Sequence, residues 1–368
     1  MSASVPSSSD LPLHGRHILV TGGAGYIGSH TVLHLISSGA RVTIVDNLSN
    51  SNLEALARVE KLAGGIKLAF YQVDIRDAVA MEKVFQENKF DACIHFAGLK
   101  AVGESVAQPM KYYDHNAGGS LVLFQLLTKY DCKRIVFSSS ATVYGVVQEN
   151  PIKETAPLGT LNPYGQTKYV IEGILRDLAV APVPEKESPW KIVILRYFNP
   201  IGAHPSGSIG EDPLGIPNNL LPFVMQVAVG RRPEVNVFGQ DYPTSDGTGV
   251  RDYIHVEDLA LGHVAAIEHG IFGGALCDKS CDSFNLGTGK GASVLEVIAA
   301  AEKASGKKIP YKVGPRRTGD IAACYADCSK ANNLLHWRAA KSLDEAVADS
   351  WRWQSQNPHG YAAPENKL

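Results

Sequence analysis

A tyrosine and a lysine four residues apart are the side chains of this sequence best suited to acid–base chemistry. Tyr164 and Lys168 follow Asn162 and Pro163, which predict the cap and first turn of a helix, so both side chains share one helix surface. A phenol acts as a base near neutral pH only when its pKa falls from about 10 toward about 7. A neighbouring ammonium, together with a second positive charge, can lower it. Alone, a Tyr-x-x-x-Lys spacing is common by chance, and such a pair is more often two ordinary surface residues.

A run of hydroxyl side chains ends a short apolar segment upstream of this pair. Residues 138–142 are Ser-Ser-Ser-Ala-Thr, after the apolar residues 135–137. Ligands of parallel sheets bind at the carboxyl ends of the strands. One of these hydroxyls can therefore reach the same substrate oxygen as Tyr164, although a plain polar turn would have the same composition.

A glycine-rich segment predicts a dinucleotide site. Gly22, Gly25 and Gly28 lie between a predicted strand and a predicted helix, where glycines permit a tight turn, close approach of amides to a pyrophosphate and close helix packing. Asp46 ends the next strand 18 residues after Gly28, where a carboxylate accepts hydrogen bonds from a ribose diol. Because Asp46 would repel a 2′-phosphate and no arginine follows it, NAD is favoured over NADP. The alternative is a plain glycine turn with a solvated aspartate.

Short apolar segments alternate with amphipathic stretches through the first half of the chain. Wholly apolar strands separated by helices are typical of a parallel sheet covered on both faces. We therefore predict an α/β fold with a doubly wound parallel (Rossmann) sheet. Its six strands are expected at 18–20, 42–45, 68–73, 93–96, 135–137 and 192–195.

The second half changes character over residues 199–219, which are rich in Gly, Pro and Asn. The elements beyond are too few and too short for another Rossmann unit, so we predict a second, smaller α/β domain. They are strands at 235–238 and 284–286, and helices at 258–268, from Ser293, and from Ser342 to Trp353. The expected division is a polar tail over 1–14, an NAD-binding domain over 15–198 and a substrate domain over 199–368, from which some segments can return to the first domain.

Composition excludes several classes of protein. The 368 residues carry 35 Lys and Arg against 37 Asp and Glu, so no basic balance points to nucleic acid or to an anionic membrane. No apolar run approaches the roughly 18 residues of a membrane span, and the first residues do not resemble a secretory signal. We expect a soluble cytoplasmic protein that binds neither nucleic acid nor membrane.

The cysteines predict neither a disulfide framework nor a metal site. Two pairs have three intervening residues, which is formally a zinc-ligand spacing, but Cys324 lies in an apolar–polar alternation typical of a strand. No accompanying His signature is present, so we expect small thiols and no metal. The six cysteines are Cys93, Cys132, Cys277, Cys281, Cys324 and Cys328.

Longer motifs identify a resemblance that covers the chain from about Ile18 to Gly360. The sequence resembles the extended short-chain dehydrogenase/reductases, and within them the UDP-glucose 4-epimerases. The matching segments are 20–30 (VTGGAGYIGSH), 95–105 (HFAGLKAVGES), 138–145 (SSSATVYG), 196–200 (RYFNP) and 249–255 (GVRDYIH). The resemblance implies tightly bound NAD, a UDP-hexose substrate and, as in relatives, a homodimer formed through the helices that begin near Pro109 and at Asn162.

The resemblance also implies which residues form the site. Catalysis would involve Tyr164, Lys168 and Ser140. The cofactor residues would be Gly22, Gly25, Tyr26, Ile27, Gly28, Asp46, Asn47, Leu48, Ser49, Asn50, Asp74, Ile75, Phe96, Lys100, Asn116, Lys168 and Tyr197. The substrate residues would be Ser140, Ala141, Thr142, Tyr164, Tyr197, Phe198, Asn199, Asn218, Asn219, Leu220, Asn236, Val237, Phe238, Arg251, Arg317, Asp320 and Cys324.

The implied reaction inverts C4 of a UDP-hexose through a transient 4-keto sugar. Tyr164 would take the proton of the 4-hydroxyl while Ser140 bonds the same oxygen, and the nicotinamide would accept a hydride from C4 and return it to the other face. Where relatives restricted to glucose and galactose have a bulky Tyr near the C2 substituent, this chain has Cys324. The smaller side chain implies room for an N-acetyl group, so that UDP-GalNAc and UDP-GlcNAc would also interconvert.

Two other functions are compatible with the same fold. A nucleotide-sugar 4,6-dehydratase generally has an Asp-Glu pair after the strand-end hydroxyl, where this chain has Ala141 and Thr142. A non-catalytic NAD-binding module would be expected to lack Tyr164, Lys168 or Ser140, and all three are present. The epimerase is therefore the favoured interpretation.

Overall fold

A parallel sheet forms the centre of the molecule. The computed structural model describes residues 11–147, 149–276, 279–317 and 320–361, so most of the expected polar tail, and Cys277, lie outside the described residues. Seven strands pair in the order β11-β6-β5-β4-β1-β2-β3, and each pair is parallel. They are β1 (His17–Thr21), β2 (Arg41–Asp46), β3 (Ala69–Gln72), β4 (Ala92–His95), β5 (Arg134–Ser140), β6 (Lys191–Tyr197) and β11 (Cys281–Leu286). The predicted doubly wound α/β fold is confirmed.

Two of these strands differ from expectation. β5 continues through Ser140 because the polar residues after Phe137 still pair with β6, Ser139 opposite Arg196 and Ser140 opposite Tyr197. β11, expected in the substrate domain, pairs with β6 at the edge of the main sheet and buries Phe284 there. The second half of the chain thus contributes a strand to the first sheet.

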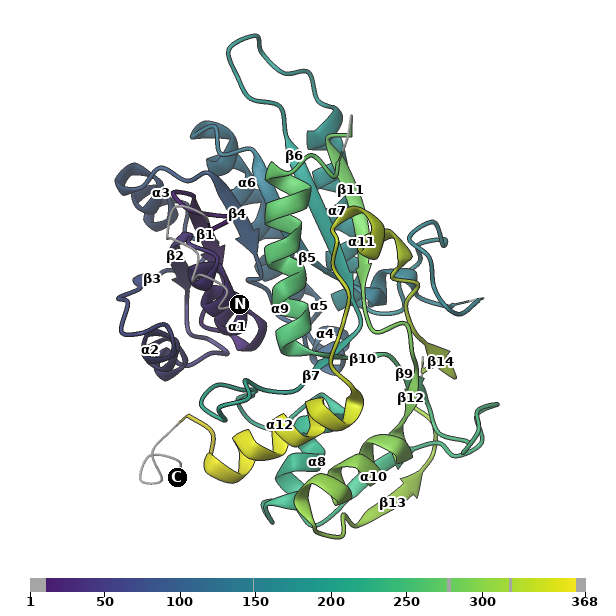
Figure 1. Ribbon diagram of the computed structural model, residues 1–368. Helices are drawn as coiled ribbons and strands as arrows, with labels where there is room; N and C mark the ends of the chain where they lie inside the picture. Colours follow the sequence, from purple (N-terminus) through teal and green to yellow (C-terminus); the bar gives the residue numbers. More distant parts are fainter. Residues whose placement is uncertain (1–10, 148, 277–278, 318–319, 362–368) are drawn as a thin grey trace, which may run out of the picture.

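Helices cover both faces of the sheet (Figure 1). On β1, Ile18 and Val20 pack in the hydrophobic cluster under α1 and α9, whereas Leu19 packs in the opposite cluster, under α3, α6 and α7. Burial on both faces explains why these strands are wholly apolar. The helices are α1 (Tyr26–Ser37), α2 (Leu53–Leu62), α3 (Ala78–Glu87), α4 (Val102–Ala107), α5 (Pro109–Tyr112), η2 (Tyr113–Gly118), α6 (Gly119–Lys129), η3 (Ala141–Tyr144), α7 (Pro163–Val180), α9 (Val256–Ala265), η4 (Ala266–Phe272) and α11 (Ser329–Leu334).

A smaller α/β layer packs beside the sheet, in the lower part of Figure 1. Its three helices share one hydrophobic cluster, which includes Val224, Val297 and Val347. Capping boxes at Ser293 and Ser342 begin two of these helices, as the sequence predicts. The elements are α8 (Leu220–Ala228), α10 (Val294–Ser305), α12 (Leu343–Gln356), β7 (Asn199–Ile201), β8 (Val235–Phe238), β9 (Val250–Arg251), β10 (Tyr253–His255), β12 (Ala292–Ser293), β13 (Tyr311–Gly314) and β14 (Ala323–Cys324).

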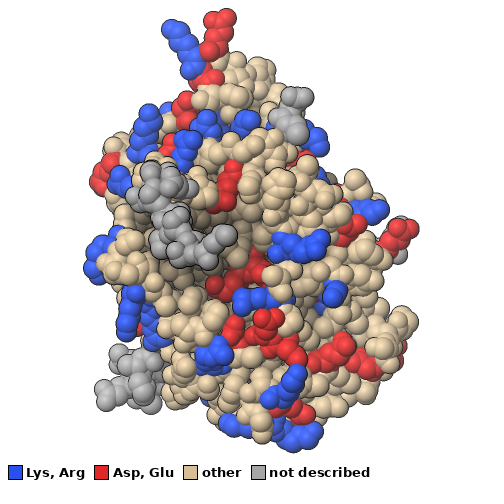
Figure 2. All heavy atoms as spheres, viewed as in Figure 1, with Lys and Arg blue, Asp and Glu red and all other residues tan. Residues whose placement is uncertain are grey.

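The helix expected at 258–268 begins earlier and ends differently. α9 starts at Val256 because the His255 side chain accepts the Glu257 amide and caps the helix. Beyond Ala265 the helix widens into the π-helical segment η4, which ends at Phe272. Among the described helices, none has the length and apolar character needed to cross a membrane. On the face shown in Figure 2, basic and acidic side chains are interspersed.

Candidate active site

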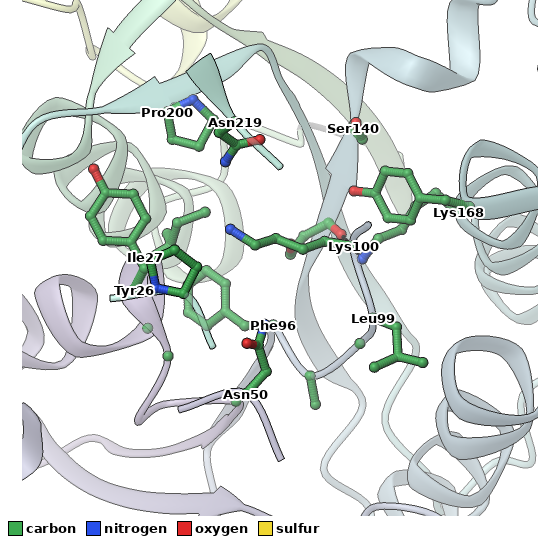
Figure 3. A pocket seen from close by; sticks show the side chains of 18 of the residues that line it. Tyr26, Ile27, Asn50, Phe96, Leu99, Lys100, Ser140, Lys168, Pro200 and Asn219 are labelled. Atoms are coloured by element: carbon green, nitrogen blue, oxygen red, sulfur yellow. Dashed lines mark hydrogen bonds between the residues drawn. The ribbon is translucent and has the colours of Figure 1, made fainter. Parts of the chain in front are cut away.

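A cleft of about 540 Å³ brings the two layers together over the carboxyl ends of the central strands. Figure 3 shows that its wall combines the glycine turn at Tyr26 and Ile27, the end of β4 at Phe96, α7 at Lys168, and Asn219 from the smaller layer. The predicted nucleotide and acid–base residues therefore lie around one space.

The glycine turn is tight enough to require glycine at two positions. Gly22 has φ +74°, in the left-handed region, and its amide donates to the Val45 carbonyl at 2.8 Å. A Cβ at Gly28 would lie 2.3 Å from the Gly22 carbonyl oxygen, so any larger residue would push α1 away from the turn. Gly25 precedes the first turn of α1 and lines the cleft together with Tyr26 and Ile27. No side chain caps α1, so the free amides of its first turn are available to a ligand in the cleft.

Asp46 fixes the position of the neighbouring loop. Its two carboxylate oxygens accept hydrogen bonds from the Ala24 amide (3.0 Å), the Leu48 amide (2.9 Å) and the Ser51 hydroxyl (2.8 Å). Asp46 lines the cleft, as do Asn47, Ser49 and Asn50. Leu48 differs from the prediction: its φ is +59°, and its side chain packs against the hydrophobic core instead of lining the cleft.

Asp74 and Ile75 line the cleft beside this loop. The Asp74 carboxylate accepts hydrogen bonds from Asn47 Nδ2 (2.9 Å) and from the Arg76 guanidinium (2.9 and 3.0 Å). The Arg76 hydrogen bonds hold the pKa of this carboxyl well below its usual range. Asp74 is therefore ionised at any physiological pH and fixes the Asn47 side chain.

Helix α7, which carries Tyr164 and Lys168, begins as the sequence predicts. The Asn162 side chain accepts the Gly165 amide at 2.8 Å, and Pro163 occupies the first turn of α7. Tyr164 and Ser140 both line the cleft, and the Ser140 side chain is close enough to influence the pKa of the Tyr164 phenol. Lys168 is buried, and its ammonium donates to the Ser138 carbonyl at 2.7 Å.

The Lys168 ammonium alone does not lower the pKa of Tyr164 in this structure. Burial lowers the pKa of Lys168 to about 8, with the Glu172 carboxylate opposing the shift. Burial raises the pKa of Tyr164, and the hydrogen bond from Ser140 offsets only part of that rise. Because the Lys168 ammonium is directed at the Ser138 carbonyl, the protein's own charges do not ionise the phenol. A cationic nicotinamide next to Tyr164 would supply the missing positive charge.

Asn116, which is predicted to contact the cofactor, is not among the residues that line the cleft. It sits in the π-helical segment η2 and is buried. Its Oδ1 accepts the Leu99 amide at 2.7 Å, and its Nδ2 donates to the Leu99 carbonyl (3.0 Å) and to Thr167 Oγ1 (2.9 Å). Asn116 therefore joins the loop after β4 to α7 and positions other lining residues.

The predicted substrate residues are divided between the cleft and its rim. Those that line the cleft are Ser140, Ala141, Thr142, Tyr164, Tyr197, Phe198, Asn199, Asn219, Arg251, Asp320 and Cys324. Arg251 is held by the Ile321 carbonyl at 2.9 Å and lies 3.6 Å from Asp320. Those outside the lining are Asn218, Leu220, Asn236, Val237, Phe238 and Arg317.

Alternation and packing explain why these residues stay outside. On β8, Val237 points into the hydrophobic core, whereas Asn236 and Phe238 point outward. Arg317 pairs with Asp320 at 2.9 Å, and its guanidinium lies 5.0 Å from the centre of the Phe238 ring. Arg317 and Phe238 thus form a rim next to Asp320, which itself lines the cleft.

The structure adds an acidic residue that the sequence analysis did not single out. Glu211 lines the cleft, where its Oε1 accepts hydrogen bonds from Lys100 (3.0 Å) and from Asn219 Nδ2 (3.1 Å). The Lys100 side chain reaches into the cleft on the side of Asn219 (Figure 3). Tyr361, near the end of the described chain, also lines the cleft and bonds the Gly210 amide at 3.0 Å. In a loop-rich segment an acidic residue resembles any solvated one, so only the pairing with Lys100 identifies Glu211.

The described residues contain no group of three or more His, Cys, Asp or Glu side chains suited to a metal ion. Cys281, Cys324 and Cys328 are free thiols, and burial raises the pKa of Cys324 to about 11. Cys324 therefore lines the cleft as a small neutral side chain.

The chain as a whole is similar to known proteins. Residues 19–350 match the family model described as GDP-mannose 4,6 dehydratase. The chain is 58% identical over 348 residues to a UDP-glucose 4-epimerase of Bacillus subtilis, covering 95% of this chain and 99% of that protein. It is 57% identical over 355 residues to UDP-glucose 4-epimerase 2 of Arabidopsis thaliana, covering 95% and 98%.

A solved structure gives the same result. The UDP-glucose 4-epimerase of Bifidobacterium longum, in complex with NAD+ and UDP, superposes with a TM-score of 0.87 and 56% identity, covering 94% of this chain and 99% of that one. Identity at this level extends over nearly the whole length of each chain. The chain belongs to the family of UDP-glucose 4-epimerases.

Proposed function

We propose that this chain inverts C4 of UDP-hexoses, converting UDP-galactose to UDP-glucose, with NAD held tightly in the cleft. One observation supports this most strongly: a single cleft contains the glycine turn with Asp46, the acid–base residues Tyr164 and Ser140, and the cation Arg251. A dinucleotide and a nucleotide sugar can therefore meet at Tyr164.

The residues of the first layer fit NAD. The amino end of α1 offers amides to a pyrophosphate. The Gly22 carbonyl oxygen leaves no room for a side chain at Gly28, so the helix lies close to the turn. Three donors orient the Asp46 carboxylate, which lines the cleft and would accept hydrogen bonds from a ribose diol. When bound, NAD supplies a hydride acceptor and donor at the sugar's C4. The lining residues that would hold it are Gly22, Gly25, Tyr26, Ile27, Asp46, Asn47, Ser49, Asn50, Asp74, Ile75, Phe96, Lys100, Lys168 and Tyr197.

Tyr164 and Ser140 would control the proton on the sugar's 4-oxygen. The Tyr164 phenolate accepts that proton, and the Ser140 hydroxyl hydrogen-bonds the same oxygen. The Lys168 ammonium, which donates to the Ser138 carbonyl, would contribute positive charge near the phenolate. When the sugar has turned over in the cleft, the phenol returns the proton to the other epimer.

The second layer would hold the uracil nucleotide. Arg251 provides a cation for the diphosphate, and Asn219 and Asn199 provide side-chain amides on the same wall. The rim residues Phe238 and Arg317 stand beside Asp320, where a uracil ring would enter. On this division, residues 15–198 form the NAD-binding domain and residues 199–368 the substrate domain, with β11 returned to the first sheet.

Adding UDP-galactose to the purified holoenzyme, without external NAD, tests the proposal. UDP-glucose should form, with no stoichiometric accumulation of reduced nicotinamide. Reduced nicotinamide formed in proportion to substrate would indicate a simple dehydrogenase instead. A 4-keto-6-deoxy product would indicate a dehydratase.

The position of Cys324 favours a wider substrate range. Cys324 on β14 lies opposite Arg251 on β9 and lines the cleft. A thiol occupies much less space than an aromatic ring, so we propose that the cleft also admits UDP-N-acetylhexosamines.

We further propose a cytoplasmic homodimer. Met110 on α5 is 77% exposed and Val106 on α4 is 62% exposed, and both helices pack against α7. Such apolar side chains on neighbouring helices suit a symmetric contact with a second copy. Five cysteines stand as free thiols among the described residues, as is usual in a reducing compartment.

A further inference from the structure

A buried ion pair joins α7 to β6, one helical turn beyond Tyr164 and Lys168. Tyr164, Lys168 and Glu172 follow one another at four-residue intervals, so they form one stripe along the helix. The Glu172 side chain is 0% exposed. Its Oε1 accepts hydrogen bonds from Arg196 Nε (2.9 Å) and Ser139 Oγ (2.6 Å), and its Oε2 accepts from Arg196 Nη2 (2.6 Å).

The arginine of this pair is attached to further elements. Arg196, on β6, is 2% exposed, and its Nη1 donates to the Tyr144 hydroxyl at 3.2 Å and the Glu154 carbonyl at 3.3 Å. The Tyr144 hydroxyl in turn donates to Asn285 Oδ1 at 2.6 Å. The ion pair therefore ties α7 to β5, β6, η3 and β11.

The pair is attached to the strand that carries the active-site serine. Ser139, which donates to Glu172, lies between Ser138, whose carbonyl accepts from the Lys168 ammonium, and Ser140, which lines the cleft with Tyr164. A displacement of α7 along β5 would therefore move Lys168 relative to Ser138 and Tyr164 relative to Ser140 at the same time.

Stability alone gives a weak reason for this arrangement. Apolar residues of similar volume often replace a buried ion pair without loss of stability. The charges have a clearer effect on the neighbouring lysine, because the Glu172 carboxylate opposes the lowering of the Lys168 pKa by burial.

We propose that Glu172 and Arg196 are positioning residues for the epimerase reaction: they fix α7 against β5 and set the electric field at Lys168 and Tyr164. This inference rests on the proposed function for its kinetic consequences only.

The charged and titratable groups around the pair determine the sign of the effect. Lys168 faces Glu172 on its own helix and His95 on β4. Tyr164 faces Tyr112 on α5 and Tyr197 on β6. The groups around Glu172 are Arg196 on β6, Arg176 on α7, Tyr144 on η3 and Cys281 on β11. Removing the Glu172 charge leaves Arg196 uncompensated, so the pKa values of Lys168 and Tyr164 should both fall.

Glu172→Gln in the holoenzyme tests the proposal because it changes charge with little change of shape. The phenolate absorbance of Tyr164, obtained by subtracting Tyr164→Phe in the same background, should titrate at lower pH than in wild type. The pH profile of kcat should move in the same direction. At the optimum, kcat should fall roughly ten- to a hundred-fold while KM stays within about two-fold, because the charge at the end of the stripe changes and Arg196 no longer holds α7 as firmly against β5.

Asp258→Asn is the matched control. Asp258 is a buried carboxylate on α9 that accepts the Ala340 and Lys341 amides, at 3.0 and 2.8 Å, outside the cleft lining. Its conversion to the amide should lower stability without changing the phenolate titration or kcat.

A second variant decides the case if Glu172→Gln fails to fold. Ser139→Ala removes one hydrogen bond from Glu172 and leaves the ion pair intact, so kcat should fall several-fold with normal NAD content. A fall in kcat with an unshifted phenolate titration in Glu172→Gln, or wild-type kcat in Ser139→Ala, would overturn the proposal. If wild type lacks epimerase activity, the proposed function fails, while the phenolate titration still decides this inference.

Discussion

On the proposed mechanism, Tyr164 must lose its phenolic proton before it can accept one from a sugar hydroxyl, yet burial raises its pKa. The cofactor's positive charge and the Lys168 field must together reverse that rise. Removing only the oxygen should therefore abolish the chemistry and little else. We expect Tyr164→Phe to lower kcat by roughly 10²- to 10⁴-fold, with NAD content and thermal unfolding near wild type. Turnover within a few-fold of wild type would remove Tyr164 from the role of base.

Asp46 should decide which dinucleotide the cleft accepts. Its carboxylate is fixed by the Ala24 and Leu48 amides and the Ser51 hydroxyl, so it cannot turn away from a 2′-phosphate. Protein stripped of cofactor should regain epimerase activity with NAD and regain little with NADP. Equal recovery with both would contradict the assignment, and recovered NAD content measured alongside separates poor binding from poor catalysis.

Cys324 should determine whether the cleft admits an acetamido group. Cys324→Tyr should lower UDP-N-acetylglucosamine turnover roughly 5- to 150-fold, since overlap with the phenol ring costs about 1 to 3 kcal/mol. UDP-galactose turnover should remain within a few-fold. Cys324→Ser, which is close in size, should keep both activities. Equal loss of both activities in the tyrosine variant would place the limit on substrate size elsewhere.

Among the elements, the turn between β1 and α1 leaves little room for a side chain. A Cβ at Gly28 would lie 2.3 Å from the Gly22 carbonyl oxygen, and backbone cannot yield as a side chain can. Gly28→Ala should therefore lower the free energy of unfolding by about 1 to 3 kcal/mol and reduce the NAD retained after purification.

Gly173→Ala is the matched control for this substitution. Gly173 lies within α7, and a Cβ there would meet no atom within 4 Å. Alanine should stabilise that helix by about 0.5 to 1 kcal/mol. Equal behaviour of the two variants would show that the turn is not as constrained as its geometry indicates.

The elements also show what the sequence can predict and where it cannot. Strands such as Ile192–Leu195 are recognisable because burial on both faces leaves only apolar residues, and Asn162-Pro163 marks the start of α7 through local capping. The edge position of β11 depends on long-range pairing with β6, which no local pattern contains.

The same distinction holds inside the cleft. Tyr164 and Lys168 are predictable because one helix fixes their spacing. The resemblance implies Asn116 and Leu48 as cofactor residues, yet Asn116 bonds Leu99 behind the cleft wall and Leu48 packs against the core. Glu211 was missed because its partner Lys100 is 111 positions away in the sequence. Contacts between distant segments are set by the assembled fold.

Across the whole molecule, buried histidines connect folding to pH. Burial lowers the pKa of His30 and His263 to about 4 and that of His95 to about 3. His30 lies on α1 beside Glu257 of α9, His95 ends β4, and His263 packs between the Phe96 and Tyr197 rings. The three imidazoles are thus neutral parts of the interior on both sides of the sheet.

These histidines predict that the protein loses stability well before its carboxylates titrate. The unfolded chain binds protons at its histidines near pH 6.5, whereas the folded chain does not until about pH 4, so stability is full above 6.5 and falls as the pH decreases. Each histidine adds a slope of about 1.4 kcal/mol per pH unit. Glu257, whose pKa is lowered to about 2, titrates in the folded chain only at lower pH. Burial raises the pKa of Asp252 and Glu154, so these carboxyls take up protons more readily in the folded chain and oppose part of this loss of stability. Denaturant unfolding of the holoenzyme between pH 6.5 and about pH 5 should show the slope, and His263→Phe, which keeps a ring between Phe96 and Tyr197, should reduce it by one histidine's share. A flat profile over this range would mean that the three imidazoles take up protons in the folded state as readily as in the unfolded chain.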